Sequence, residues 1–268
     1  MNSQLRREYL DALGLKTWTL RTAHGTADAP SLVIASRATS AAPAAPAAPA
    51  PAALAAPAPS APASALAAAV PAPARDVSAM REAGLDWDEL RARVAACTRC
   101  SLSATRTQTV FGVGNPHADW LIVGEAPGAE EDRRGEPFVG RAGQLLNSML
   151  HAIGLAREQV YIANVLKCRP PGNRDPGATE AAECLPYLER QIALLKPKIM
   201  LAVGRIAAQN LLRTEKTLGA LRQQVHRFGL SQVPLVVTYH PAYLLRTPTE
   251  KRKAWEDLKF ARDVISRV

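Results

Sequence analysis

The sequence lacks any run of about 20 apolar residues, which is the length that a membrane-spanning helix needs. Its first residues are charged and contain no apolar core, so they do not resemble a secretion signal. Cysteine is scarce, at 4 of 268 residues. We therefore expect no membrane segment and a place in the reducing cytosol, where four cysteines are more often metal ligands or free thiols than two disulfides.

Residues 41–74 carry no charge and no aromatic side chain. They are almost wholly Ala and Pro with a few Ser, and prolines at this density prevent a helix. An extended, partly polyproline-II spacer is the expected structure. The sequence thus predicts a disordered N-terminal extension over 1–35, an Ala/Pro-rich linker over 36–76 and a folded domain over 77–268.

Acidic residues are the minority among the charges. The chain has 24 Asp and Glu against 33 Lys and Arg, which gives a formal net charge of +9. A basic balance of this size favours a polyanionic partner. Charge alone leaves nucleic acid and an anionic membrane surface both open.

The four cysteines suggest one shared site. Cys97 and Cys100 form a C-x-x-C pair, whereas Cys168 and Cys184 lie on either side of a Pro/Gly-rich loop. Zinc sites commonly use two short C-x-x-C pairs, so the wide second spacing favours a larger group such as an iron-sulfur cubane. The alternative for Cys184, inside a predicted helix, is a buried small apolar side chain.

Apolar runs rich in β-branched residues alternate with helical patterns. Strands are predicted at 120–123, 160–162, 199–203 and 235–238, and helical spacing is clearest over 145–153 and 185–195. This order predicts a three-layer α/β/α fold around a central, mainly parallel four-stranded sheet. In such sheets, ligands bind at the carboxyl ends of the strands.

Polar or tight-turn elements follow all four predicted strands. They are the Gly-Glu-Ala-Pro-Gly segment over 124–128, then Asn164, Gly204, and His240 with Pro241. Each has an ordinary explanation as a turn or a helix cap. Because all four fall at strand ends, a common pocket is the better interpretation.

These motifs, taken in order, resemble the family 4 uracil-DNA glycosylases, the iron-sulfur branch of their superfamily. The resemblance rests on C-x-x-C at 97–100, GEAPGAEED at 124–132, PFVGRAGQLL at 137–146, NVLKCRPPGNR at 164–174 and HPAYLLR at 240–246. It implies hydrolysis of the bond between uracil and its sugar in DNA, which initiates base excision repair. It also implies that the four cysteines bind one 4Fe-4S cluster, and that the enzyme works at the nucleoid in the cytoplasm.

The resemblance also implies roles for the residues that surround the flipped base. Phe138 would stack on uracil, Asn164 would bind its O4 and N3-H, and His240 would donate a hydrogen bond to O2. Ala126 would line the same pocket, where the best-known relatives carry Asp. The aromatic residue that excludes thymine in those relatives has no evident counterpart in this sequence.

An acidic side chain is expected to orient the attacking water or to stabilise the cationic sugar. Glu131 is the first candidate because the family's motif places a functional carboxylate there. Glu125 is the second.

The predicted DNA contacts fall into two groups. Gly128, Gly140, Arg141 and Lys167 are expected at phosphates. Leu244 and Leu245 are candidates for an apolar wedge in the minor groove, with burial in the core as the alternative.

Residues 7–21 form a short amphipathic segment similar to the tail of the psi subunit of DNA polymerase III. The similarity implies docking on the chi subunit of the clamp loader, with Trp18 and Leu20 as anchors. A nonfunctional extension is the alternative.

Two other functions remain open from the sequence. One is a glycosylase with broader specificity for deaminated bases, because the small Ala126 leaves room. The other is a noncatalytic DNA-binding or replication-associated protein.

Overall fold

The computed structural model describes residues 82–268. The predicted peptide at 7–21, the extension and the linker lie outside the described residues. Within the described part, no helix is both long and apolar enough to cross a membrane.

A six-stranded sheet forms the centre of the described domain, in the order β1-β3-β2-β4-β6-β5. The strands are β1 Val113–Gly114, β2 Trp120–Gly124, β3 Tyr161–Asn164, β4 Ile199–Val203, β5 His226–Phe228 and β6 Val233–Thr238. The four predicted strands are β2, β3, β4 and β6, and they pair in parallel. The expectation of only four strands was wrong: β1 and β5 are antiparallel edge strands of two and three residues, too short to leave a pattern in the sequence.

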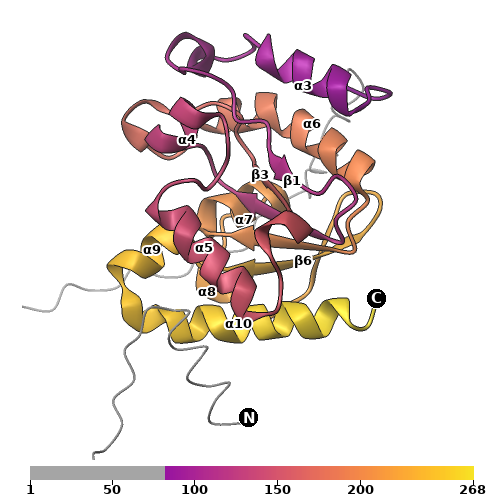
Figure 1. Cartoon of the computed structure of the whole chain (residues 1–268), viewed down its shortest axis with the longest axis vertical. Coiled ribbons are helices and arrows are strands. Elements are labelled where there is room, and N and C mark those ends of the chain that lie inside the picture. Colours follow the sequence, from indigo (N-terminus) through magenta and orange to yellow (C-terminus); the bar gives the residue numbers. More distant parts are fainter. Residues whose placement is uncertain (1–81) are drawn as a thin grey trace, which may run out of the picture. The chain divides into compact units, whose positions relative to one another are not determined.

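Helices cover both faces of this sheet, which confirms the predicted α/β/α arrangement (Figure 1). The α-helices are α3 Trp87–Ala95, α4 Ala129–Arg134, α5 Arg141–Ala152, α6 Ala178–Leu195, α7 Arg205–Leu212, α8 Leu218–Leu221, α9 Pro241–Arg246 and α10 Lys251–Ile265. Short 3-10 turns lie at Ser101–Ala104, Arg157–Gln159, Pro171–Asn173 and Pro248–Glu250.

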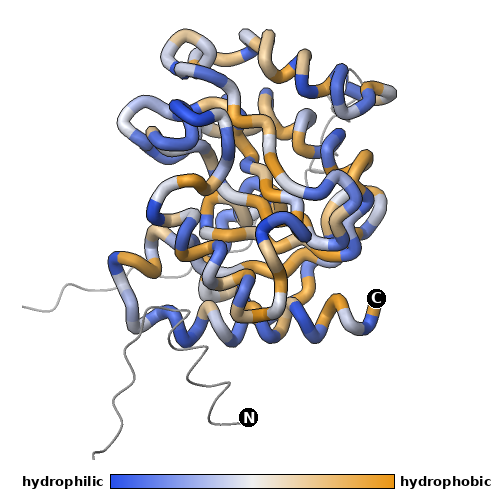
Figure 2. Tube along the Cα trace, in the orientation of Figure 1, coloured by the Kyte–Doolittle hydropathy of each residue, from blue (hydrophilic) through white to orange (hydrophobic). Residues whose placement is uncertain are grey.

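The two faces of the sheet carry separate apolar clusters because side chains alternate along each strand. In β2, Leu121 and Val123 join the cluster of α3, α6 and α7, whereas Ile122 joins that of α5 and α10. Figure 2 shows hydrophobic and hydrophilic residues interspersed along α10, as expected for a helix with one buried and one exposed face. Burial of these two faces positions the carboxyl ends of the four parallel strands at one edge.

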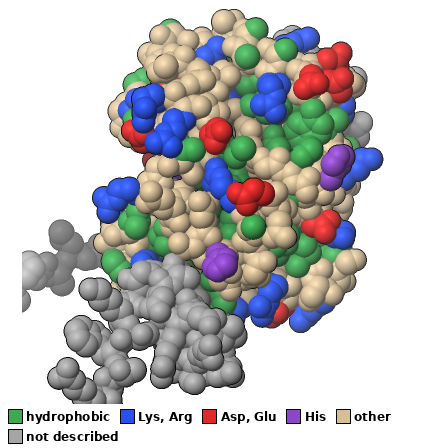
Figure 3. Space-filling view, viewed as in Figure 1, with side chains coloured by type: hydrophobic (Ala, Val, Ile, Leu, Met, Phe, Trp, Pro, Cys, Tyr) green, Lys and Arg blue, Asp and Glu red, His purple; other side chains and the backbone are tan. Residues whose placement is uncertain are grey.

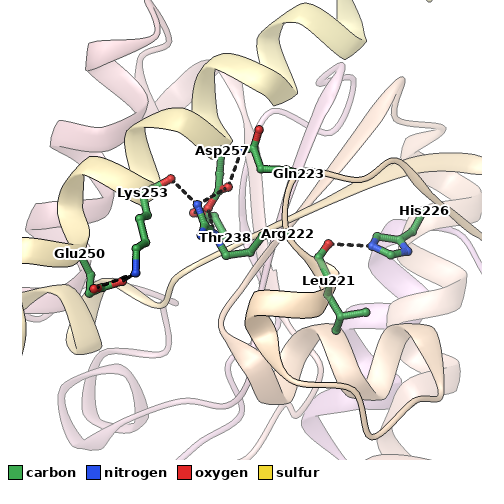
Figure 4. Close-up of polar contacts among 8 residues, drawn as sticks. All are labelled: Leu221, Arg222, Gln223, His226, Thr238, Glu250, Lys253 and Asp257. Atoms are coloured by element: carbon green, nitrogen blue, oxygen red, sulfur yellow. Dashed lines mark hydrogen bonds and ion pairs between the residues drawn. The ribbon is translucent and has the colours of Figure 1, made fainter.

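A buried acidic network fixes the end of β6 (Figure 4). The Asp257 carboxylate of α10 is fully buried and accepts hydrogen bonds from Thr238 at 2.9 Å, from Arg222 at 2.7 and 2.8 Å, and from Gln223 at 2.7 Å. A buried charge with this many donors is stable where an unpaired one is not. The network therefore ties α10 to the strand end that leads into His240.

Candidate functional site

A cavity of about 380 Å³ lies where β2, β3 and β6 end. Seven predicted site residues line it: Glu125, Ala126, Gly128, Glu131, Phe138, Asn164 and His240. The structure also brings in Pro170, Asn173, Arg174, Asp175 and Arg246, to which the sequence analysis gave no role. Four of them lie inside the recognised motifs at 164–174 and 240–246, which was the signal that could have found them, and Asp175 directly follows the first of these motifs.

Asn164 forms the floor of the cavity. It ends β3, pairs with Gly124 of β2 and is 2% exposed. Its side-chain Oδ1 is buried and has no hydrogen-bond partner in the described part of the chain. A buried acceptor left in this state costs about 1–3 kcal/mol, so the site is built for a ligand that donates to it.

Gly124 leaves the space that brings two of the predicted groups together. A Cβ at this position would lie 2.4 Å from Asn164 Oδ1 and 2.7 Å from the Phe138 ring. The amide and the aromatic ring therefore both lie close to the backbone of Gly124, where no larger residue fits.

Phe138 is held in an unusual backbone conformation. Its φ is +53°, a left-handed value that is strained for an aromatic residue. Helix α5 presses against it, because a Cβ at Gly143 would lie 1.8 Å from the Phe138 carbonyl oxygen. Arg157 donates to the carbonyl of Pro137 at 2.6 Å. The loop is thereby fixed on both sides of the ring.

Glu131 contributes to the same loop. Its Oε1 accepts hydrogen bonds from the backbone N–H groups of Val139 at 3.0 Å and Gly140 at 3.1 Å. One oxygen of Glu131, the first candidate for the water-orienting carboxylate, is thus engaged in holding the Phe138 loop. The Gly140 N–H is also engaged by this carboxylate, and the predicted phosphate contact of the backbone around Gly140 stays a prediction.

His240 presents a neutral imidazole to the cavity. Its Nδ1 accepts a hydrogen bond from the Ala242 N–H at 3.1 Å, which places the ring proton on Nε2. Burial, reinforced by the nearby Arg246 charge and opposed by Glu131, lowers the His240 pKa to about 4. The ring centroid lies 5.7 Å from that of Phe138. At neutral pH the group is a hydrogen-bond donor without a net charge.

Glu125 is a partly buried carboxylate whose pKa lies well above its ordinary value. Burial, together with the negative charge of Asp175, raises its pKa to about 7, although Arg205 acts in the opposite direction. Asp175 and Arg205 form an ion pair of 3.1 Å nearby. A carboxylate with a pKa near 7 is suited to accept a proton from water at neutral pH.

The four cysteines line a second cavity, together with Arg106 and Lys167. None forms a disulfide. The Arg106 guanidinium donates to Cys168 Sγ at 3.1 Å, and the Lys167 backbone N–H donates to Cys184 Sγ at 3.2 Å. Burial raises the pKa of Cys168, and that of Cys184 to about 12. Among the described residues, no group of three or more His, Cys, Asp or Glu side chains is arranged for a single metal ion.

Lys167 does not face solvent, so its predicted phosphate contact was wrong. The residue is 1% exposed, and its ammonium donates to the Asn164 carbonyl at 2.8 Å and to Gln191 Oε1 at 2.7 Å. Burial lowers its pKa to about 8, while Cys184 and Cys168 act in the opposite direction.

Leu244 is likewise fully buried, in the cluster that α5 and α10 form, so it is not a wedge. Successive residues of a helix point in different directions, and Leu245 is accordingly 36% exposed. Arg141 is exposed at the first position of α5. Figure 3 shows Lys and Arg side chains spread over the viewed face rather than gathered in one patch.

Comparison with known proteins identifies the family. Residues 111–259 match the model of the uracil DNA glycosylase superfamily. The chain is 45% identical to the type-4 uracil-DNA glycosylase of Archaeoglobus fulgidus over 64% of this chain and 89% of the relative. It is 40% identical to that of Thermotoga maritima, over 65% and 92%. A type-5 uracil-DNA glycosylase of Thermus thermophilus is 34% identical over 44% of this chain and 59% of the relative. The chain therefore belongs to the uracil-DNA glycosylase superfamily, with the type-4 enzymes.

Proposed function

We propose that this protein is a uracil-DNA glycosylase that hydrolyses the bond between uracil and deoxyribose and so initiates base excision repair. The observation that carries the proposal is the buried, unpartnered Oδ1 of Asn164 beside the Phe138 ring. The experiment that tests it is single-turnover release of uracil from a labelled oligonucleotide. Parallel substrates with hypoxanthine or thymine mismatches separate this function from a glycosylase of broader specificity.

Asn164 supplies the specificity in this proposal. Its Oδ1 accepts the N3–H of uracil and its NH₂ donates to O4. Cytosine presents the opposite pattern, with an amino donor beside a bare ring nitrogen. The Asn164 side chain would then face mismatched partners, which a buried site rejects strongly.

We assign the water-orienting role to Glu125 rather than to Glu131. Both carboxylates line the cavity, but Glu131 uses one oxygen to hold the Phe138 loop. Glu125 has a pKa of about 7. The ionised form is the active one. The rate constant for uracil release should therefore rise with pH, about tenfold per unit below pH 7, and level off above it.

The Glu125→Gln variant should be about 10²-fold slower than the wild type above pH 7, and it should show no rise with pH. The measurement is the pH profile of single-turnover release, with Glu130→Gln as the control, because Glu130 is an exposed neighbour paired with Arg133. A wild-type profile that persists unchanged in Glu125→Gln would return the role to Glu131.

The protein surface that we propose to contact DNA lies next to the cavity. Arg246 is exposed and lines the cavity together with Gly128, and the exposed Arg141 directly precedes Ala142 of the lining. Leu245 lies one residue before Arg246. Leu245 is the remaining candidate to fill the gap that a flipped base leaves in a duplex. A single strand has no such gap. Leu245→Ala should therefore slow release from a duplex more than from a single strand, and an equal effect on both would exclude the wedge.

The cysteine site fits a 4Fe-4S cluster held by Cys97, Cys100, Cys168 and Cys184. Four thiols around one cavity, with N–H groups directed at two of the sulfurs, are the usual surroundings of such a cluster. A cubane spreads its ligands over four corners, so it does not require the compact geometry of a single-ion site. The cluster would act as a rigid cross-link, because glycosidic hydrolysis transfers no electrons.

Cys168→Ala should lose iron and its visible absorption, and its free energy of unfolding should fall by roughly 2–5 kcal/mol, as when a structural cross-link is removed. Iron content, visible absorption and thermal unfolding of anaerobically purified protein are the measurements. Ser103→Ala is the control, because Ser103 lines the same cavity without a thiol. Full iron content in Cys168→Ala would contradict the assignment.

The peptide at 7–21 is proposed as a tether to the replication machinery, through the chi subunit of the clamp loader. The support is its sequence similarity alone. Purified chi subunit should retain the full chain in a pulldown and lose it when Trp18 is changed to Ala. Equal retention of the two chains would exclude this contact.

A further inference from the structure

Lys167 connects the cavity of Asn164 with the cysteine site. It lies between the two in the sequence, three residues after Asn164 and directly before Cys168. Its side chain turns back, so that the ammonium donates to the Asn164 carbonyl at 2.8 Å. Its backbone N–H donates to Cys184 Sγ at 3.2 Å. One residue therefore contacts the chain at both sites.

The second partner of the ammonium is Gln191, which is fully buried in α6. Gln191 Oε1 accepts from Lys167 at 2.7 Å, while its Nε2 donates to the Phe111 carbonyl at 2.9 Å. Helix α6 also carries Cys184. The Lys167 side chain thus attaches the backbone of Asn164 to the helix that provides a cysteine of the second cavity.

A buried lysine at this position lowers the stability of the folded chain, so its presence calls for a contribution that an apolar residue could not make. Removing an ammonium from water is strongly unfavourable, and its two hydrogen bonds offset that cost only in part. An apolar residue would fill the same space without that cost. What the lysine adds is a fixed hydrogen bond to the carbonyl of Asn164 itself.

We propose that Lys167 is a positioning residue for uracil recognition, which holds the Asn164 backbone against α6 so that the amide keeps the orientation that uracil requires. The inference rests on the proposed function, because it assigns uracil recognition to Asn164. It goes beyond that function in placing a specificity determinant outside the cavity. Lys167 does not line the cavity of about 380 Å³ and does not touch the base.

The test compares Lys167→Met, Gln191→Met and the double variant with the wild type. Three quantities are measured for each: the affinity for free uracil, the affinity for an undamaged duplex, and the iron content. Lys198→Met is the control, because Lys198 is an exposed lysine paired with Asp119 at the other end of the sheet.

Lys167→Met and Gln191→Met should each bind free uracil roughly 10- to 100-fold more weakly, with duplex affinity and iron content unchanged. Because Lys167 and Gln191 act through the same hydrogen bond, the double variant should bind free uracil no more weakly than the more impaired of the two single variants. Wild-type uracil affinity in a folded, iron-containing Lys167→Met chain would overturn the proposal. So would additive losses in the double variant.

If Lys167→Met fails to fold or loses iron, Gln191→Met decides the question by the same criterion. A wild-type chain that neither binds nor releases uracil would instead overturn the proposed function. The two failures are therefore distinguishable.

Discussion

Asn164→Leu is expected to slow uracil release by about 10²- to 10⁴-fold. Leu has the same branching and the same number of side-chain heavy atoms as Asn, but its methyl groups can neither donate nor accept, so both hydrogen bonds to uracil are lost. Each leaves a buried uracil group without a partner at a cost of about 1–3 kcal/mol. The measurement is the single-turnover rate constant on a uracil oligonucleotide, with saturating enzyme so that binding does not limit the rate.

Asn210→Leu is the matched control for this variant. Asn210 lies in α7 and donates to the Ile206 carbonyl at 2.8 Å, and it does not line the cavity. Its change should leave the rate within about twofold of the wild type. A similar loss in both variants would indicate a general effect on stability. A wild-type rate in Asn164→Leu would exclude Asn164 as the recognition residue.

His240→Leu is expected to slow release by about 10²- to 10³-fold, or roughly 3–4 kcal/mol. The departing uracil develops negative charge at O2, and the Nε2–H of His240 is the donor that the structure leaves for it. Because negative charge at O2 grows as the bond to the sugar breaks, this hydrogen bond contributes more in the transition state than in the ground state. A loss in the rate constant with little loss in duplex affinity is the expected signature.

The low pKa of His240, about 4, gives this prediction a second measurement. The unfolded chain gains a proton on this ring below about pH 6.5, whereas the folded chain gains it only near pH 4. The wild type should therefore lose stability as the pH falls from 6.5 to 4, and His240→Leu should lose less. His151→Leu, at an exposed position of α5, is the control. A wild-type rate that required protonated histidine near pH 6.5 would contradict the neutral-donor account.

Much of the fold was predictable because the parallel strands are buried on both faces. β2 and β4 are therefore continuous apolar runs that a single sequence reveals. The short edge strands β1 and β5 carry no such signal, since they owe their conformation to pairing with β3 and β6. Strand order follows from the packing of helices on both faces, which no local pattern records.

The side chains around the cavity were predictable by type and less so by role. Asn164 and His240 follow strands, and strand ends of a parallel sheet converge. The direction of a side chain depends on distant contacts, however. Lys167 turns inward because Gln191, 24 residues later, accepts its hydrogen bond. The contacts of Glu131 likewise depend on the backbone groups of Val139 and Gly140, which lie eight and nine residues later.

The most direct test of the account is single-turnover release from paired oligonucleotides that carry uracil or cytosine at the same position, with the wild type and Asn164→Leu. The account predicts rapid release of uracil by the wild type, no release of cytosine, and a loss of uracil release in the variant. Intact, iron-containing protein that binds both oligonucleotides and releases neither base would contradict it, and would favour a DNA-binding protein without glycosylase activity.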